Sequence, residues 1–396
     1  MTNNSWRPFL LVSLALCIGT LGTALASPLY PIYQELWHLL PSHITYIFVA
    51  YMFGCLATLL FLGRTSNSIG YLRSLQIGLV FVILGLILSA WAASAYALAI
   101  GRFIIGIASG LISTSAMLGL IYTIPEQHKS NAAQFSSIIT VLGFGLGPLV
   151  GGLIAEFSAQ PLITPYLPVI VIAVLSLLSL FSLKTSRFET QPFSVAPHLE
   201  LPEKPYHAAF FIAGLTAFTA FGTFSLFASL AASFVEEIIP WHGPLVSGSA
   251  ISSILFISAA VQFYAKSMSP NRGIRIGLIA MLISFALLAL CMTLHWSWLF
   301  FVSDILVGIG HGLGLLGAFG LIHQMTQTQN RAAVMSTYLF VGYLGTIVPI
   351  IAVGYLADHF GLSAAILWFC LAISLLCLVL LVWQKKLLED KTKMPC

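Results

Sequence analysis

The chain has 396 residues, of which 59% are hydrophobic and 7% are charged. Because about 25% of the residues in a typical soluble domain are charged, this composition excludes an ordinary soluble protein and indicates a membrane protein. The formal net charge of +4 is too small to indicate a nucleic-acid partner, and we expect none.

Twelve apolar runs follow one another along the chain, each of about 20 residues. A helix of that length crosses about 30 Å of hydrocarbon while its backbone hydrogen bonds are satisfied internally. We therefore predict an all-α integral membrane protein with twelve transmembrane helices. The runs cover residues 8–30, 44–62, 74–93, 97–122, 132–155, 164–183, 208–232, 245–265, 275–294, 298–323, 332–356 and 362–383.

The basic residues indicate how these spans are oriented. If the N-terminus is cytoplasmic, 15 of the 16 Lys and Arg residues fall in cytoplasmic segments, and the remaining one, Arg102, lies within a span. Cytoplasmic loops carry such an excess of basic residues, so both termini are predicted to be cytoplasmic. Arg7 and the apolar run after it also imitate a cleavable signal peptide, but we expect this first helix to be retained.

The chain repeats itself at a spacing of about 200 residues. The segment Arg102–Gly110 matches Asp304–Gly312 at an offset of 202, and Pro148 matches Pro349 at an offset of 201. Six helices are thus followed by six related helices in the same orientation. Such repeats pack about an axis along the membrane normal, with the substrate path between them.

A polar segment separates the two repeats. Residues 184–207 carry Lys, Arg, Glu and three prolines, a composition typical of a linker. We therefore predict an N-terminal six-helix bundle over 1–183, a cytoplasmic linker over 184–207, and a C-terminal six-helix bundle with a short cytoplasmic tail over 208–396. The two bundles are expected to be pseudo-symmetric.

The fifth run contains glycines and a proline where soluble helices avoid them. Gly143, Gly147 and Gly151 lie one turn apart and expose a groove into which a second helix can press its backbone. Pro148 removes one backbone hydrogen bond and bends the helix, and Gly152 follows Gly151 directly. A thin, bent, closely packed helix is typical of a protein whose two halves rock against each other.

These motifs resemble those of a known family. The Gly143-x-x-x-Gly-Pro-x-x-Gly-Gly152 run resembles the antiporter signature of the 12-span drug:proton antiporter branch of the major facilitator superfamily. Leu98-x-x-x-Arg102-x-x-x-Gly106 resembles the intramembrane arginine motif of that superfamily. The loop between the second and third spans resembles its cytoplasmic loop motif through Gly63, Arg64, Asn67, Gly70 and Arg73.

The resemblance covers nearly the whole chain and implies a transporter that works by alternating access, with protons as the coupling ion. It also implies a multi-pass protein of the bacterial plasma (inner) membrane that works as a monomer. Two features depart from the family pattern. The loop has Asn67 and Ser68 where an Asp and a basic residue are usual, and the first span has no acid before Glu35.

Two charged residues lie well inside the predicted spans, Arg102 and Asp304, at equivalent positions of the repeat. A charge inside the bilayer is costly unless it is paired or faces water, so each is a candidate for function. One hypothesis places them opposite each other across the cavity, with Asp304 as the titrating group. The alternative is that Arg102 only bonds backbone carbonyls of its own half.

His311 lies two helical turns after Asp304 and on nearly the same face. A histidine within a span can titrate near neutral pH, so His311 is a candidate for proton coupling together with Asp304 and Arg102. The alternative is a neutral His311 that hydrogen-bonds to a helix backbone.

The resemblance implies that the first, fourth, seventh and tenth spans line the cavity, and polar stripes run along three of these. The stripes consist of Thr20, Thr23, Ser27 and Tyr30, of Ser109 and Ser113 after Arg102, and of Thr216, Thr219 and Thr223. Hydroxyls in helices often bond their own i−4 carbonyl instead. Candidates for contact with an apolar substrate are Met117, Phe144, Phe224, Phe227 and Tyr343.

These features favour a multidrug-type exporter of lipophilic or amphipathic small molecules, exchanged for protons. The alternatives are an exporter or facilitator of one polar metabolite, such as an amino acid, sugar or siderophore, and, more remotely, a receptor that kept the fold without transport. An enzyme is not expected, because the ionisable groups within the spans are few and widely spaced. No cofactor is expected, and the spacing of the six cysteines indicates no metal site.

Overall fold

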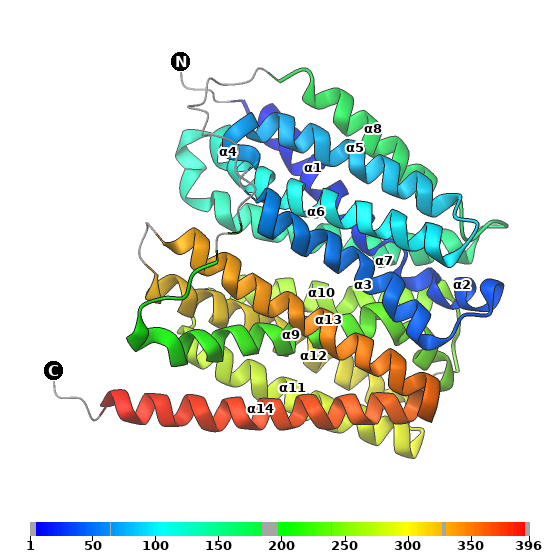
Figure 1. The fold of residues 1–396 in the computed structure, drawn as a ribbon, viewed down its shortest axis with the longest axis vertical. Coiled ribbons are helices and arrows are strands. Elements are labelled where there is room, and N and C mark those ends of the chain that lie inside the picture. Colours follow the sequence, from blue (N-terminus) through cyan, green and yellow to red (C-terminus); the bar gives the residue numbers. More distant parts are fainter. Residues whose placement is uncertain are drawn as a thin grey trace. The chain divides into compact units, whose positions relative to one another are not determined.

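The computed structural model describes residues 5–63, 65–183, 197, 199–238, 240–326 and 330–392. Arg64 and most of the predicted linker lie outside this part. All regular structure within it is helical (Figure 1). The α-helices are α1 Arg7–Ala24, α2 Tyr30–Trp37, α3 Pro41–Ala57, α4 Thr65–Ile69, α5 Tyr71–Ala90, α6 Ala95–Thr123, α7 Ala132–Glu156, α8 Tyr166–Leu180, α9 His207–Ile238, α10 Pro244–Tyr264, α11 Pro270–Leu294, α12 Ser297–Met325, α13 Arg331–Phe360 and α14 Leu362–Thr392.

Short turns of other helix types extend several of these elements. Among the described residues, 3₁₀ turns cover Ser27–Leu29, Glu126–Asn131 and Lys204–Tyr206, and a π-helical turn covers Thr58–Leu62 at the end of α3. The first apolar run is therefore not one straight helix. It passes from α1 through a 3₁₀ turn into α2, with prolines in the first turn of both later pieces, where no backbone N–H is needed.

Eleven helical stretches of the described chain are long and apolar enough to cross a membrane. The sixth predicted span contains α8, which has only 15 residues. Hydrogen-bonded turns continue on both sides of it, with Tyr166 N donating to Ile163 O and Phe181 N donating to Leu178 O. With α8 there are twelve spans, as predicted, so the chain is an all-α integral membrane protein.

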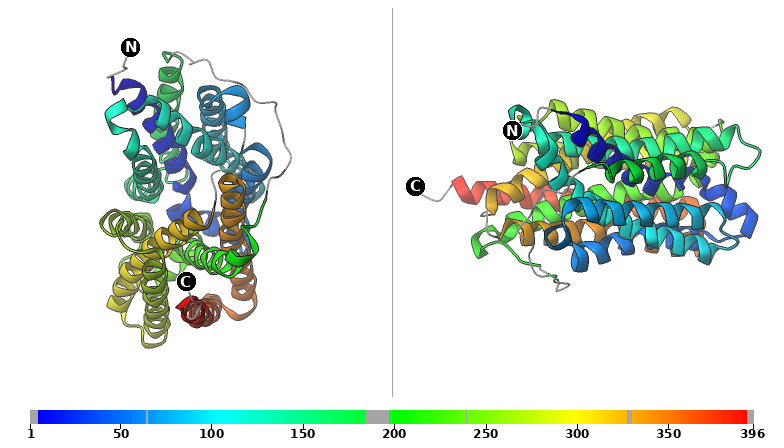
Figure 2. Two further views of the ribbon diagram at one scale, coloured as in Figure 1. Left: turned by 90° about the vertical axis from the view of Figure 1, so that its left-hand side faces the viewer. Right: turned by 90° about the horizontal axis from the view of Figure 1, so that it is seen from above.

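The chain forms two compact units. Unit 1 consists of residues 1–39, 46–197 and 243–252, and unit 2 of 40–45, 198–242 and 253–396. Within unit 1, α5 packs along α6 and α1 along α7. Within unit 2, α11 packs along α12 and α9 along α13; the α11–α12 pair runs side by side in every view (Figures 1 and 2).

Small residues let these helix pairs approach closely. In unit 1, an added Cβ on Gly101 of α6 would lie 3.0 Å from the carbonyl oxygen of Gly85 in α5. In unit 2, a Cβ on Gly277 of α11 would lie 2.6 Å from the backbone nitrogen of Gly314 in α12. Without a hydrophobic driving force between helices in lipid, such close packing is a main source of helix association.

Two acids 202 residues apart accept hydrogen bonds at helix N-termini. In unit 1, Glu156 Oε2 accepts from the backbone nitrogen of Leu245, in the first turn of α10, at 3.2 Å. In unit 2, Asp358 Oδ1 accepts from the backbone nitrogen of Ser42, in the first turn of α3, at 3.0 Å. Each carboxylate satisfies a backbone donor that its helix leaves unpaired and complements the helix dipole.

Candidate functional site

Arg102 of α6 lies inside unit 1 and is 1% exposed. Its Nη1 donates a hydrogen bond to the carbonyl oxygen of Thr23 in α1. Its guanidinium carbon lies 5.2 Å from the ring centroid of Tyr51 in α3, a cation–π contact. Arg102 thus bonds a carbonyl of its own half, and its approach to Asp304 across the cavity stays a prediction.

Asp304 of α12 lies inside unit 2 and is 5% exposed. Its Oδ2 accepts a hydrogen bond from the hydroxyl of Ser253 in α10. Its Oδ1 is buried and has no hydrogen-bond partner among the described residues. A carboxyl group held by one neutral donor is costly to keep ionised inside an apolar bundle, so its protonation state can change with its surroundings.

His311 is the second titratable group in α12 and is 6% exposed. The hydroxyl of Ser258 lies 2.9 Å from His311 Nδ1, and Gln262 Nε2 donates to that hydroxyl at 3.1 Å. The ring of Phe224 in α9 stands 5.9 Å from the imidazole centroid. His311, Ser258 and Gln262 thus form a hydrogen-bonded chain. Because Gln262 is only partly buried, this chain leads from the interior of unit 2 towards its surface.

The sequence reasoning missed the three residues of α10 that hold these groups, Ser253, Ser258 and Gln262. A glutamine inside an otherwise apolar run is the one signal that could have indicated them. Serines are too common in membrane helices to stand out, because they satisfy themselves by bonding their own helix.

The threonine hydroxyls of the predicted polar stripes bond their own helices. Thr216, Thr219 and Thr223 donate to carbonyls four residues earlier, at 2.7 to 2.8 Å. Thr20 donates to Leu16 O at 2.9 Å, and Thr23 to Thr20 O at 2.5 Å. All five side chains are buried, as are Ser27, Tyr30 and Ser109. Ser27 Oγ and Tyr30 OH have no hydrogen-bond partner among the described residues. The threonines therefore offer few free hydroxyls, and contact of the stripes with a substrate stays a prediction.

The open face of α9 is apolar and largely aromatic. Phe211 is 40% exposed, and the side chains that follow it along this face are half-buried: Leu215, Phe218, Phe221 and Phe224. The ring of Phe221 stands 5.6 Å from that of Tyr343 in α13. Phe227 instead lies in the core, 5.8 Å from the ring of Phe234.

The other predicted contact residues lie on different helices. Met117 of α6 is 47% exposed, and Ser113 of α6 and Phe144 of α7 are half-buried. Phe144 and Met117 belong to unit 1, whereas Phe224 and Tyr343 belong to unit 2. Each unit thus has an apolar surface of its own that contains predicted contact residues.

The glycines of the fifth span face other backbones within unit 1. An added Cβ on Gly147 would lie 2.6 Å from Leu21 O in α1, and those on Gly143 and Gly151 would collide with Thr20 of α1 and with Leu25, directly after α1. Gly152 faces the carbonyl of Pro244 at the start of α10. Pro148 lies inside α7, and its carbonyl oxygen faces Gly248 of α10.

The predicted loop motif lies between α3 and α5. Gly70 has a φ of 87°, a conformation that favours glycine, and it directly precedes α5. Gly63 ends the π-helical turn, and Arg73 is exposed in the first turn of α5. Arg64 and the side chain of Asn67 lie outside the described residues.

Twelve membrane-spanning helices with intramembrane charges and glycine-lined seams define a membrane transporter. The family model of the Major Facilitator Superfamily matches residues 12–290 and 210–393, so the chain belongs to this superfamily. Its fold resembles that of a bacterial homolog of the human lysosomal transporter Spinster, with a TM-score of 0.74, 13% identity and 98% of each chain covered.

Curated relatives match parts of the chain. Multidrug resistance protein 2 of Bacillus subtilis is 25% identical over 274 residues, covering 65% of this chain and 66% of the relative. The synaptic vesicular amine transporter of Rattus norvegicus is 26% identical over 180 residues, covering 42% of this chain. The match spans 33% of the length of that amine transporter. A multidrug efflux pump PmrA homolog of Lactococcus lactis is 33% identical over 97 residues, 24% of each chain.

Proposed function

We propose that this transporter exports lipophilic or amphipathic small molecules in exchange for protons, by alternating access of its two halves. The observation that carries the coupling part of the proposal is Asp304, a buried carboxyl group held by Ser253 through one oxygen. Its other oxygen has no partner among the described residues. A proton added from one side of the membrane would make this group neutral and cheap to bury, and its release to the other side would complete the exchange.

The apolar character of the open face of α9 supports a lipophilic substrate. Phe218, Phe221 and Phe224 offer flat hydrophobic surface, and Phe224 lies beside His311. An aromatic cation would bind favourably there for two reasons. The phenylalanine rings attract a positive charge, and the rings of the cation bury apolar area against them. The B. subtilis and L. lactis relatives carry names that refer to multidrug resistance and efflux, which agrees with this substrate class.

We further propose that the protein works as a monomer in a bacterial inner membrane with both termini in the cytoplasm. The distribution of Lys and Arg residues supports this orientation. In that orientation the substrate and the proton move in opposite directions through one site that opens to each side in turn.

Measurement of substrate-triggered proton movement in proteoliposomes tests the coupling. We expect the wild type to move protons with several lipophilic cations and the Asp304→Asn variant to move none, because an amide cannot carry the proton. Asp304→Glu should retain part of the activity. Glu35→Gln is the matched control, since Glu35 is an exposed acid outside these sites, and it should behave as the wild type. Unchanged proton movement in Asp304→Asn would overturn the proposed coupling.

The second candidate is a transporter of one polar metabolite. A Clostridioides difficile relative named riboflavin transporter RibZ, 22% identical over 169 residues, favours it. The buried, self-bonded threonines disfavour it, because a polar substrate needs free donors and acceptors. A panel of substrates distinguishes the two candidates: one tightly bound polar compound, or many weakly bound lipophilic ones.

A further inference from the structure

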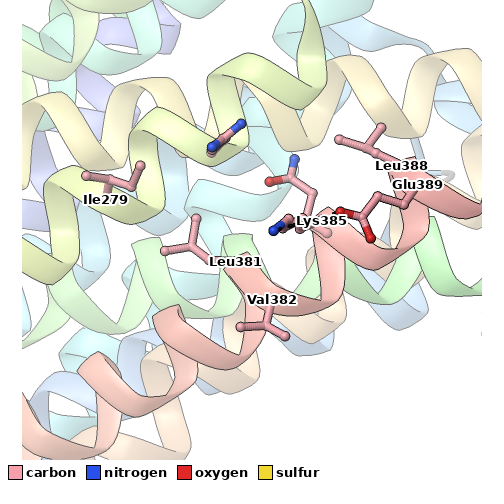
Figure 3. A pocket seen from close by; sticks show the side chains of 8 residues that line it. Ile279, Leu381, Val382, Lys385, Leu388 and Glu389 are labelled. Carbon is pink, nitrogen blue, oxygen red and sulfur yellow. Dashed lines mark ion pairs between the residues drawn. The ribbon is translucent and has the colours of Figure 1, made fainter.

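A groove outside the proposed transport site lies between α11 and α14 in unit 2 (Figure 3). It has a volume of about 470 Å³, within the range of small-molecule sites. Side chains of both helices line it: Arg275 and Ile279 from α11, and Leu381, Val382, Gln384, Lys385, Leu388 and Glu389 from α14.

One end of the groove is basic. Arg275 is exposed and makes no ion pair with any described residue. Lys385 lies 3.8 Å from Glu389, with side-chain exposures of 78% and 54%. An exposed pair of this kind contributes little to stability, so the ammonium group can turn to another anion at little cost. The groove therefore presents two cations and one acid that opposes them.

The other end of the groove is apolar. Ile279 is 38% exposed and Val382 is 56% exposed, and Figure 3 shows them on two different helices, both to the left of Lys385. Between the two ends, Gln384 is buried and its Nε2 donates to Asn271 O at 2.8 Å, which fastens α14 to the start of α11. The groove thus has fixed walls, a basic end and an apolar end that continues along the lipid-facing surface.

The length of α14 places the basic end at the membrane–water interface. Its 31 residues extend over about 46 Å, whereas the hydrocarbon core is about 30 Å thick. The surplus must lie at the end that carries charges, because Lys385, Lys386 and Glu389 follow an apolar stretch that begins at Leu362. Phospholipid phosphates lie at that depth, and basic pockets between membrane helices bind anionic headgroups.

We propose that this groove binds an anionic phospholipid, with its phosphate between Arg275 and Lys385 and an acyl chain along Ile279 and Val382. The guanidinium group suits a phosphate because its planar donors match two phosphate oxygens. A neutral, zwitterionic lipid gains less, because its own cation competes for the same phosphate. The bound lipid lies across α11 and α14 and therefore connects the two helices at this end.

Native mass spectrometry of the purified full-length protein tests the site, with palmitoyl-oleoyl phosphatidylglycerol and phosphatidylcholine as the two probes. The wild type should bind the first single phosphatidylglycerol molecule about fivefold or more tightly than phosphatidylcholine, a preference of about 1 kcal/mol. The double variant Arg275→Gln/Lys385→Gln should lose this preference. The matched control is Arg272→Gln/Lys386→Gln, which removes two exposed charges beside the groove and should keep the preference.

The variant Glu389→Gln should change the affinity for phosphatidylglycerol in the opposite direction. It removes the acid that opposes the anion, so phosphatidylglycerol should bind severalfold more tightly. Because Glu389 is exposed, this variant remains informative if the double variant does not fold. Weaker or unchanged binding in Glu389→Gln would overturn the proposal.

Two other results would also overturn it. If the control pair lowers the preference as much as the groove pair, the effect comes from net charge and not from the groove. If inorganic phosphate at matched ionic strength abolishes lipid binding, the groove holds a free phosphate and the acyl chain contributes nothing. Binding of phosphatidylglycerol that survives phosphate and depends on Arg275 and Lys385 supports the lipid site.

Discussion

The helices that carry Arg102 and Asp304 share one pattern of glycines, but the side chains around the two charges differ. Each charge precedes two glycines by four and eight residues, Gly106 and Gly110 in α6 and Gly308 and Gly312 in α12, and these glycines admit the neighbouring helix closely. In unit 1 that neighbour is α3 and in unit 2 it is α10. The repeated scaffold is therefore a means of bringing a second helix against a buried charge.

The side chains that fill the two scaffolds differ. Arg102 bonds a backbone carbonyl and covers an aromatic ring, so its charge is built into the packing of unit 1. Within the described residues, Asp304 accepts a hydrogen bond from the hydroxyl of Ser253, and its other oxygen has no partner. At the position of Ser109 in the first repeat stands His311 in the second. This difference agrees with the proposal that Asp304 in unit 2 carries the proton, while Arg102 in unit 1 bonds a carbonyl of a neighbouring helix.

Substitution of the glycines should give the largest effect. A Cβ on Gly106 would collide with the carbonyl oxygen of Tyr51, whereas a Cβ on Gly308 would overlap less, at 2.8 Å from Cβ of Ile257 and 3.0 Å from the carbonyl oxygen of Ile254. We expect Gly106→Ala to cost about 3 kcal/mol of unfolding free energy and Gly308→Ala about 1 kcal/mol. Thermal unfolding in detergent measures both. Equal losses would show that the two seams are equally tight.

Replacement of the charges should give the next effect. Arg102→Met removes a hydrogen bond from a charged group, and we expect a loss of about 2–3 kcal/mol. Asp304→Asn should change stability by less than about 1 kcal/mol, because the amide oxygen can still accept from Ser253. Chemical unfolding of the two variants checks the order. A reversed order would contradict the division between a structural and a titrating charge.

Two residues that face these glycines, Thr58 opposite Gly110 and Ser258 opposite Gly312, carry hydroxyls with different partners. Ser258→Ala breaks the chain from His311 to Gln262 and should lower proton-coupled transport by about fivefold, the equivalent of one hydrogen bond of about 1 kcal/mol. In the described part of the chain, the hydroxyl of Thr58 in unit 1 donates to two backbone carbonyls, those of Gly54 and Ile107. Its isosteric variant Thr58→Val should leave transport unchanged. Equal transport rates in the two variants would remove the chain from the coupling mechanism.

The smallest effect is expected at the two acids that cap helices. Glu156→Gln and Asp358→Asn keep an oxygen acceptor for Leu245 and Ser42 but remove the negative charge from the helix N-terminus. Each should lower the unfolding free energy by about 0.3–1 kcal/mol. Because the two sites share no partner, the double variant should show the sum of the single effects. A loss larger than the sum would indicate coupling between them.

Much of the fold was predictable because its causes are local to the sequence. Apolar length alone gave the twelve spans, and the 202-residue repeat indicated that Arg102 and Asp304 stand at equivalent positions. The interruption between α1 and α2 was not predicted, although Pro28 and Pro31 mark it. Those prolines lie at helix starts, where they are tolerated, so the apolar pattern continues across them.

The site was less predictable because periodicity does not show which face of a helix is open. In α9 the threonines form a helical stripe, whereas the phenylalanines at every third position drift around the helix, and polarity favoured the threonines as the lining. The structure buries Thr216, Thr219 and Thr223 with their hydroxyls bonded to their own helix, and leaves Phe218 and Phe221 half-buried on the open face. In a membrane helix, a threonine that bonds its own backbone behaves as a small apolar side chain. Its polarity in water is therefore a poor guide to whether it lines a cavity.

The short helix α8 has a consequence for the surrounding bilayer. Its 15 residues rise about 22 Å, about 8 Å less than a typical hydrocarbon core. Hydrogen-bonded turns lengthen the span, but lipids beside a short apolar helix are still expected to thin locally, at a cost of a fraction of a kcal/mol per ångström. Membranes of shorter-chain lipids should relieve this mismatch. The thickness of the bilayer therefore changes the energetic cost of placing unit 1 in it.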